Sequence, residues 1–152
     1  MRPAYNDFAT AFAPELLGVE IEGTSIAADT VTDNFGVDRY SGIWVYGEVG
    51  TLTGTSPTLT VRLRTLIPTG PVDDLYSTTQ AIEIAASSVI SANGTKFAFA
   101  VVSSGDDNFA DATAAVTAAT AKNVPLGVKC DLLLDVGGTG PTVPITKLRV
   151  EL

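Results

Sequence analysis

Hydrophobic and polar residues alternate on both sides of a glycine- and proline-rich stretch in the first half of the chain. The apolar residues hold odd positions throughout: Ile43, Val45 and Val49 precede the stretch, and Leu59, Val61 and Leu63 follow it. Side chains alternate faces along a β-strand, so each segment presents one apolar face. Residues 50–57 between them carry the glycines and the proline typical of a turn. The pattern predicts a half-buried antiparallel hairpin over residues 42–66.

The turn motif of this hairpin recurs near the C-terminus. Gly54-Thr-Ser-Pro-Thr58 is echoed by Gly138-Thr-Gly-Pro-Thr142, and apolar segments flank both copies. The sequence therefore predicts a strand, a G-T-x-P-T turn and another strand at two places in the chain. Pro144 follows the second copy and cannot donate a hydrogen bond to a β-ladder, so we expect the last strand, 143–152, at a sheet edge.

Further short segments show strand patterns, and they cover residues 20–27, 81–85, 97–102 and 128–136. Asn93-Gly94 predicts a hairpin turn, because both residues tolerate a positive φ. The segment Ala112–Ala121 is ambiguous, since its alanines favour a helix and its threonines a strand. It has no helical stripe of large apolar residues, so we expect an irregular or strand-like segment. Short strands separated by turns predict an all-β fold, an antiparallel β-sandwich or jelly-roll-like domain.

The first 18 residues differ from the rest and are interpreted as an extended N-terminal arm, with residues 19–152 as a single β-sandwich domain. Pro14 stops any helical turn early. The arm contains several large apolar residues that precede the alternating strands, and these are candidate partner-binding residues: Tyr5, Phe8, Phe12 and Leu16. Residues 1–38 also contain seven acidic residues against Arg2 alone, which suits either solubility or a basic partner surface.

Composition narrows the possible functions. With 152 residues and 45% hydrophobic content, the chain suits one folded domain. The net charge of -8 argues against nucleic-acid binding, which needs a basic surface. No apolar run has the length of a membrane helix, and the N-terminus does not resemble a signal peptide, so we expect a product made in the cytoplasm and no membrane partner.

The chain contains few residues that are suited to catalysis or metal binding. The chain has no histidine, which excludes histidine-based triads and metal sites, and Cys130 is its single cysteine, which we expect to be a small buried hydrophobe. Asp106–Asp111 is dense in oxygen ligands but lacks the spacing of an EF-hand, so a polar loop is the favoured interpretation. Asp73, Asp74 and Glu83 have no spacing that identifies a glycosidase pair. We therefore predict a protein that is not an enzyme and that needs no cofactor or metal.

Trp44 and Tyr46 lie two residues apart, opposite the apolar phase of their strand. An aromatic pair on an otherwise polar face suits a sugar or a protein partner. A sandwich covered on both faces would instead bury the two rings. Both interpretations stay open, and both residues join the candidate partner-binding set.

Six sequence blocks, in this order, resemble small β-sandwich structural proteins of tailed-bacteriophage virions, of the capsid decoration or cement type. The blocks span most of the chain: Phe12-Ala-Pro-Glu-Leu-Leu17, Gly23-Thr-Ser-Ile-Ala27, Tyr40-Ser-Gly-Ile-Trp-Val-Tyr-Gly-Glu-Val49, Leu52-Thr-Gly-Thr-Ser-Pro-Thr-Leu-Thr-Val61, Pro125-Leu-Gly-Val-Lys-Cys130 and Val136-Gly-Gly-Thr-Gly-Pro-Thr-Val143. The segment 64–71 is more apolar than its counterpart in that family, and residues 110–121 have no counterpart.

The resemblance implies a non-enzymatic protein on the capsid surface of a virion, bound to the major capsid protein and to copies of itself, as a homotrimer. It also implies that the protein stabilises the shell. The alternative from a different class is a carbohydrate-binding β-sandwich module on a host-recognition appendage. The first hypothesis predicts an apolar arm buried in a neighbour, and the second predicts an exposed aromatic platform among polar groups.

Overall fold

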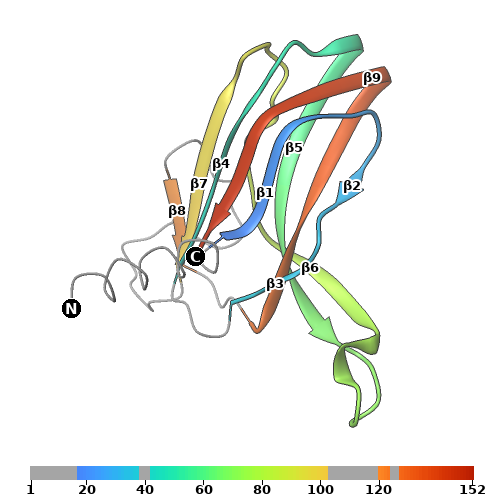
Figure 1. Ribbon diagram of the computed structural model, residues 1–152, viewed down its shortest axis with the longest axis vertical. Coiled ribbons are helices and arrows are strands. Elements are labelled where there is room, and N and C mark those ends of the chain that lie inside the picture. Colours follow the sequence, from blue (N-terminus) through green and yellow to red (C-terminus); the bar gives the residue numbers. More distant parts are fainter. Residues whose placement is uncertain (1–16, 38–41, 103–119, 124–126) are drawn as a thin grey trace, which may run out of the picture.

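The computed structural model describes residues 17–37, 42–102, 120–123 and 127–152, and most of these lie in β-strands (Figure 1). The strands are β1 (Leu17–Ile26), β2 (Thr30–Val31), β3 (Phe35–Gly36), β4 (Gly42–Val49), β5 (Thr53–Pro68), β6 (Thr79–Ala86), β7 (Lys96–Val102), β8 (Thr120–Asn123) and β9 (Lys129–Glu151), with a short 3-10 turn, η1 (Leu75–Ser77), before β6. The strand pairs are antiparallel except for the parallel pair of β7 and β8. The predicted all-β fold is confirmed.

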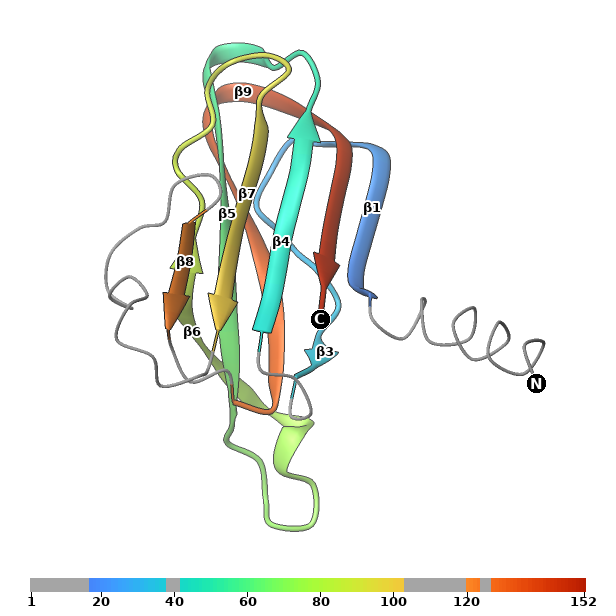
Figure 2. The same cartoon turned by 90° about the vertical axis from the view of Figure 1, so that its left-hand side faces the viewer.

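Strand β9 organises the sheet, because its 23 residues run through both halves of the molecule. Its first part pairs with β5, β2 and β3, and its last part pairs with β1 and β4. The order β6-β5-β9-β4-β7-β8 is therefore one continuous sheet. This sheet curls until its two halves face each other (Figure 2). The jelly-roll connectivity stays a prediction.

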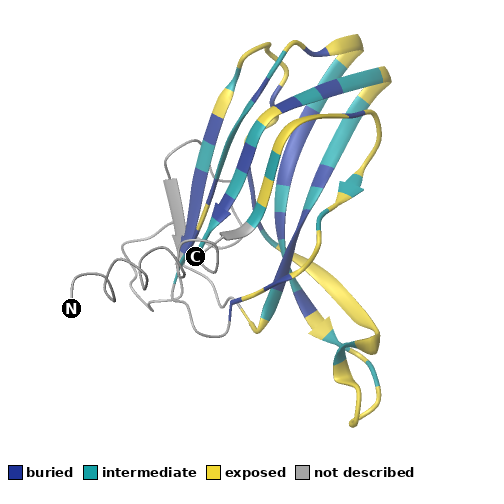
Figure 3. Cartoon of the chain, in the orientation of Figure 1, coloured by how far each residue is buried: buried dark blue, intermediate teal, exposed yellow. Residues whose placement is uncertain are grey.

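The core lies between the two halves and follows the predicted alternation. The odd-numbered apolar residues are fully buried, and they come from both halves of the sheet: Ile43, Val45, Val49, Leu59, Val61, Leu63, Phe99 and Val101. Buried positions alternate with more exposed ones in β4 and in the last part of β9 (Figure 3). The predicted apolar faces of residues 42–66 and 97–102 are therefore confirmed.

The predicted hairpin over residues 42–66 is wrong in its pairing. β4 pairs with β7 and β9, whereas β5 pairs with β6 and β9, so the two strands belong to opposite halves of the sheet. Asn93-Gly94 likewise forms a turn, with Gly94 at φ +67, but it leads from β6 in one half to β7 in the other. A period of two specifies which face is buried, and it does not specify the partner strand.

The repeated G-T-x-P-T motif is not a chain-reversing turn. Its two copies lie inside β5 and β9 and pair with each other, with Thr55 opposite Thr139. Gly54 and Gly138 have φ of +111 and +105, and a Cβ on Gly54 would lie 2.6 Å from the carbonyl oxygen of Gly140. The ladder register shifts at this point, as it does in β-bulges, which bend strands. Both strands bend side by side at this end of the molecule, and there the sheet passes from one half to the other (Figure 1).

The expected edge position of the last strand is also wrong. The C-terminal part of β9 lies between β1 and β4, so it is an interior strand. Pro144 is tolerated because it lies beside a register shift between Glu48 and Val49, where the regular ladder with β4 is interrupted. Its carbonyl oxygen still accepts a hydrogen bond from the Gly50 N–H at 2.9 Å.

The boundary of the predicted arm shifts slightly, because β1 begins at Leu17 rather than after residue 18. Residues 1–16 and the greater part of the segment Ala112–Ala121 lie outside the described residues. In the part of the chain that is described, no helix is long and apolar enough to span a membrane.

Candidate binding surfaces

Strand β4 presents an aromatic and polar face on the side opposite the core. Ile43 and Val45 point into the core and are fully buried, whereas Trp44 is 55% exposed and Tyr46 is half-buried. The alternation of the strand therefore places both aromatic rings on the outer face. The sequence left open whether the two rings are exposed or buried, and the structure shows that Trp44 is exposed.

The register places a different set of neighbours beside each outer residue of β4. Trp44 lies between Glu151 of β9 and Ala100 of β7, and Tyr46 lies between Arg149 and Ala98. Side chains directly opposite each other on neighbouring strands have Cβ atoms about 4.5–5.5 Å apart. The indole of Trp44 thus has a small residue on one side and a carboxylate on the other. We call Trp44, Tyr46, Arg149 and Glu151 the outer aromatic face.

Polar contacts connect three members of this face. The Tyr46 hydroxyl donates a hydrogen bond of 2.7 Å to Oε1 of Glu151. This bond, together with burial, raises the pKa of Tyr46 above its ordinary value. Arg149 places Nη1 3.9 Å from Glu151 and Nε 3.7 Å from Glu20 of β1. The Nε atom is buried and has no hydrogen-bond partner, so one donor of the face is unsatisfied.

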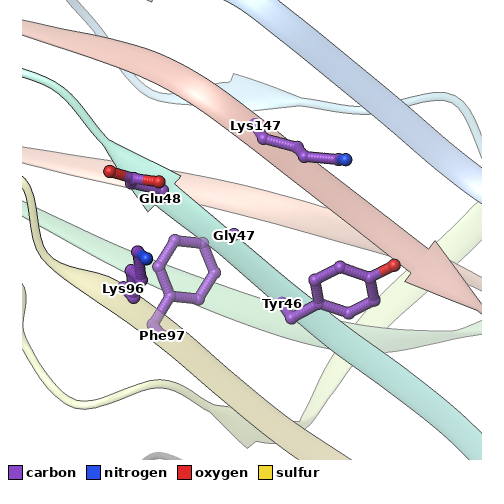
Figure 4. Close-up of a pocket in the computed structure, with 6 residues that line it drawn as sticks. All are labelled: Tyr46, Gly47, Glu48, Lys96, Phe97 and Lys147. Carbon is purple, nitrogen blue, oxygen red and sulfur yellow. The ribbon is translucent and has the colours of Figure 1, made fainter.

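An open hollow of about 240 Å³ continues the outer aromatic face along β4 (Figure 4). It surrounds Gly47 and is lined by Tyr46, Glu48, Lys96, Phe97 and Lys147. Glu48 lies between the two lysines in the ladder, so charges alternate across this row. A Cβ at position 47 would collide with the backbone oxygen of Lys147 and would lie 2.7 Å from the Phe97 ring. The hollow therefore depends on glycine.

A second candidate surface is the projecting ribbon, residues 64–83, formed by the end of β5, η1 and the start of β6. It extends beyond the body of the sheet (Figure 1), and its surface is largely exposed (Figure 3). Large apolar side chains along it face solvent: Ile67 at 41%, Val72 at 92%, Leu75 at 47% and Ile82 at 43%. An isolated two-stranded hairpin is marginally stable in water, so such a ribbon benefits from a covering partner.

The tip of the projecting ribbon is ordered by its own hydrogen bonds. The Thr69 N–H donates to the Thr78 carbonyl at 2.9 Å, and the Gly70 N–H donates to the Leu75 carbonyl at 3.0 Å. The Lys129 ammonium lies 4.5 Å from the ring centroid of Tyr76, which ties the tip to the start of β9. Val72 is thus exposed from a fixed backbone rather than from a loose loop.

Ion pairs hold the base of the projecting ribbon against β9. Arg62 bridges Glu83 of β6 and Asp135 of β9, with both distances at 2.8 Å. Arg64 makes two hydrogen bonds of 2.8 Å to Asp131. These contacts fix the direction in which the ribbon leaves the body.

A shallow groove of about 420 Å³ lies between β1 and β2. Its apolar residues are Val19, Ile21 and Val31, and its polar residues include Glu20 and Asp33. The groove is acidic at its rim, so it does not complement the ribbon tip, which carries Asp73 and Asp74.

The other residues singled out from the sequence have varied outcomes. The candidate arm residues Tyr5, Phe8, Phe12 and Leu16, and the acidic loop Asp106–Asp111, lie outside the described residues. Glu83 is engaged by Arg62, whereas Asp73 and Asp74 lie in the ribbon tip. Within the described ranges, no group of three acidic, cysteine or histidine side chains is arranged to hold a metal ion.

Cys130 is fully buried, as predicted. Burial first, and the neighbouring Asp131 second, raise the pKa of its thiol to about 12. A thiol with such a pKa stays protonated at neutral pH and is a poor nucleophile.

The sequence analysis did not predict the projecting ribbon, because residues 68–74 contain two prolines and a glycine and have the composition of an ordinary loop that ends the predicted hairpin. The available signal was Val72 and Leu75, two large apolar residues among loop-forming ones.

The chain matches no protein-family model, no curated protein and no solved structure.

Proposed function

We propose that this chain is a non-enzymatic structural protein of a tailed-bacteriophage virion, bound to the outside of the capsid as a decoration protein that stabilises the shell. The sequence resemblance supports this role. The observation that carries it is the projecting ribbon: an ordered tip that exposes Val72 almost completely, on a base fixed by ion pairs. Ordered apolar protrusions of this kind suit docking against a second protein.

The ribbon supplies binding energy mainly by apolar burial. Covering a valine or leucine side chain completely contributes roughly 1.5–3 kcal/mol. The tip also carries Asp73 and Asp74 and contains no basic residue between positions 69 and 77, so it suits an apolar pocket with a basic rim. Exposed charges contribute about 0–1 kcal/mol each. Burial therefore outweighs charge in holding the protein on the shell.

A partner in this role is the major capsid protein, and copies of the chain itself are a second partner. Among the described strands, β6 is the outermost of its half, and its outer edge has no strand beside it. Unpaired edges are commonly covered by another chain, and closed symmetry is one way to achieve this. A homotrimer stays a prediction from the resemblance, and so does the docking role of the N-terminal arm.

Fractionated virions test the proposal. In virions of the phage that carries this gene, we expect the chain at a fixed ratio to the major capsid protein, measured by quantitative mass spectrometry of purified heads. Its absence from heads would refute the proposal.

An add-back assay tests the ribbon itself. Heads assembled without this gene product are incubated with wild-type protein, with Val72→Asp, or with Val89→Asp. Val89 is 64% exposed but lies outside the ribbon, so it is the matched control. Of the three proteins, we expect only Val72→Asp to lose binding to the heads. Equal binding of all three proteins would exclude the ribbon as the docking element.

A further inference from the structure

We propose that the outer aromatic face, Trp44 with Tyr46, Arg149 and Glu151, is a binding site for a neutral pyranose sugar of a glycan chain. This site goes beyond the proposed structural role and does not depend on it. The face lies on β4 and β9, whereas the docking element lies on β5 and β6, so one molecule has separate surfaces for both.

The first component is a stacking platform. Trp44 is 55% exposed, although its neighbours at positions 43 and 45 are fully buried. On β7, the residue directly opposite Trp44 is Ala100, and the residue directly opposite Tyr46 is Ala98. Ala98 is partly exposed and leaves room beside the Tyr46 ring, whereas Ala100 is itself covered, at 3% exposed. The apolar face of a pyranose ring packs against an exposed indole, which offers a large rigid apolar surface.

The second component is a set of hydrogen-bonding groups at the edge of the platform. Glu151, directly across from Trp44, accepts a hydrogen bond from Tyr46 through Oε1, and a carboxylate has about four acceptor positions. The Nε of Arg149 is buried, but the side chain as a whole is 26% exposed, and its Nη1 lies 3.9 Å from Glu151, too far for a hydrogen bond. A ligand hydroxyl both donates and accepts, so it serves the carboxylate and the guanidinium together.

The mixed signs of these groups select the class of ligand. An anion would meet Glu20 and Glu151, and a cation would meet Arg149. A neutral ligand with several hydroxyl groups avoids both repulsions and satisfies donors and acceptors alike. This combination of an aromatic surface with adjacent donors and acceptors is the chemistry that recognises a pyranose.

The face is long enough for more than one sugar unit. Trp44, Tyr46 and Glu48 follow each other on the same side of β4, and a rise of about 3.3 Å per residue separates the first from the last by about 13 Å. The hollow around Gly47 lies at the far end of this row, next to Tyr46 (Figure 4). We therefore expect a short oligosaccharide to lie along the strand, with one ring on Trp44.

Trp44 is the single tryptophan of the chain, so intrinsic fluorescence reports on this site directly. The purified full-length protein is titrated with maltotriose, cellotriose and tri-N-acetylchitotriose. We expect a saturable change in Trp44 emission with at least one of them, with a Kd around the millimolar range. Glu151→Gln keeps the shape of the side chain but removes its charge, so we expect about a tenfold weaker Kd. Glu83→Gln, which removes a carboxylate in the ribbon, is the control and should bind like wild type.

Two outcomes would overturn the proposal. One is the absence of a saturable change with all three sugars up to about 50 mM, well above the millimolar Kd expected for such a site. The other is equal binding by Trp44→Ala and wild type in isothermal titration calorimetry, with both proteins folded by circular dichroism. Because the assay contains no virion, failure here leaves the capsid role unaffected, and absence from virions leaves the sugar site unaffected.

Discussion

Arg64 of β5 and Asp131 of β9 face each other across the ladder and form a two-bond ion pair. Nε and Nη2 of the arginine donate to the two carboxylate oxygens, both at 2.8 Å. The Asp131 side chain is 7% exposed and that of Arg64 is 20% exposed. Such a planar two-bond pair has a defined geometry, and removing one partner leaves the other charge poorly solvated.

Asp131→Asn should therefore lower the free energy of unfolding by about 2–4 kcal/mol, somewhat less than the loss of a fully buried pair. Urea denaturation followed by circular dichroism measures this change. The control is Asp135→Asn, since the Arg62–Asp135 pair is about one-third exposed on both sides. We expect a change of about 0–1 kcal/mol there. Equal losses for the two variants would contradict the role assigned to burial.

Gly47 is a glycine whose replacement should be costly. In Gly47→Ala the new Cβ would collide with the Lys147 backbone oxygen and crowd the Phe97 ring. We expect a loss of about 3 kcal/mol in unfolding free energy, the upper end of the range for overpacking, because part of the obstacle is backbone and cannot rotate away.

Gly23→Ala is the matched control for this substitution. Gly23 has φ +66 but no atom within 4 Å of an added Cβ. Alanine is disfavoured there only by the left-handed backbone conformation, which should lower the unfolding free energy by about 1 kcal/mol. A larger loss at Gly23 than at Gly47, measured by the same denaturation, would show that close packing around Gly47 relaxes easily.

Ser87 supports β5 through a buried side-chain contact. Its Oγ accepts a hydrogen bond from the Val61 N–H at 3.0 Å and donates one to the Ser88 carbonyl at 2.9 Å. Ser87→Ala leaves the Val61 N–H without this partner, so we expect a loss of about 1–3 kcal/mol. Ser77→Ala removes an exposed hydrogen bond of 2.8 Å and should change the unfolding free energy by less than about 0.5 kcal/mol. Indistinguishable midpoints in urea would contradict this prediction.

Cys130 should make stability depend on alkaline pH. In the folded chain its pKa is raised to about 12, from an ordinary value of 9.0. Above the unfolded pKa the unfolded chain loses the proton first, so stability is fully present below about pH 9 and falls as the pH rises toward 12. The slope is about 1.4 kcal/mol per pH unit between those values.

Unfolding free energies at several alkaline pH values, for wild type and for Cys130→Ala, measure this effect. The difference between the two proteins should shrink as the pH rises, because only the wild type has this thiol. A difference that stays constant up to pH 11 would show that the thiol titrates normally. A thiol reagent gives a second measurement, since native protein should react only as fast as it unfolds.

The sequence by itself determined the fold class and the buried faces. The odd-numbered apolar residues from Ile43 to Leu63 predicted which side chains fill the core, because a strand has a side-chain period of two whatever its partner. The same alternation placed Trp44 and Tyr46 on the opposite face. Burial of Cys130 also followed from its position in an apolar strand.

Tertiary structure alone decided which strands pair and where the chain bends. The two G-T-x-P-T copies have the composition of turns, yet they lie next to each other in β5 and β9 as a shared bend. Pro144 reads as an edge residue, yet a register shift accommodates it inside the sheet. Pairing depends on contacts between residues far apart in the sequence, which local periodicity does not encode. The exposure of Val72 and the neighbours of Trp44 arise from the same long-range pairing, so the candidate surfaces became visible only in the fold.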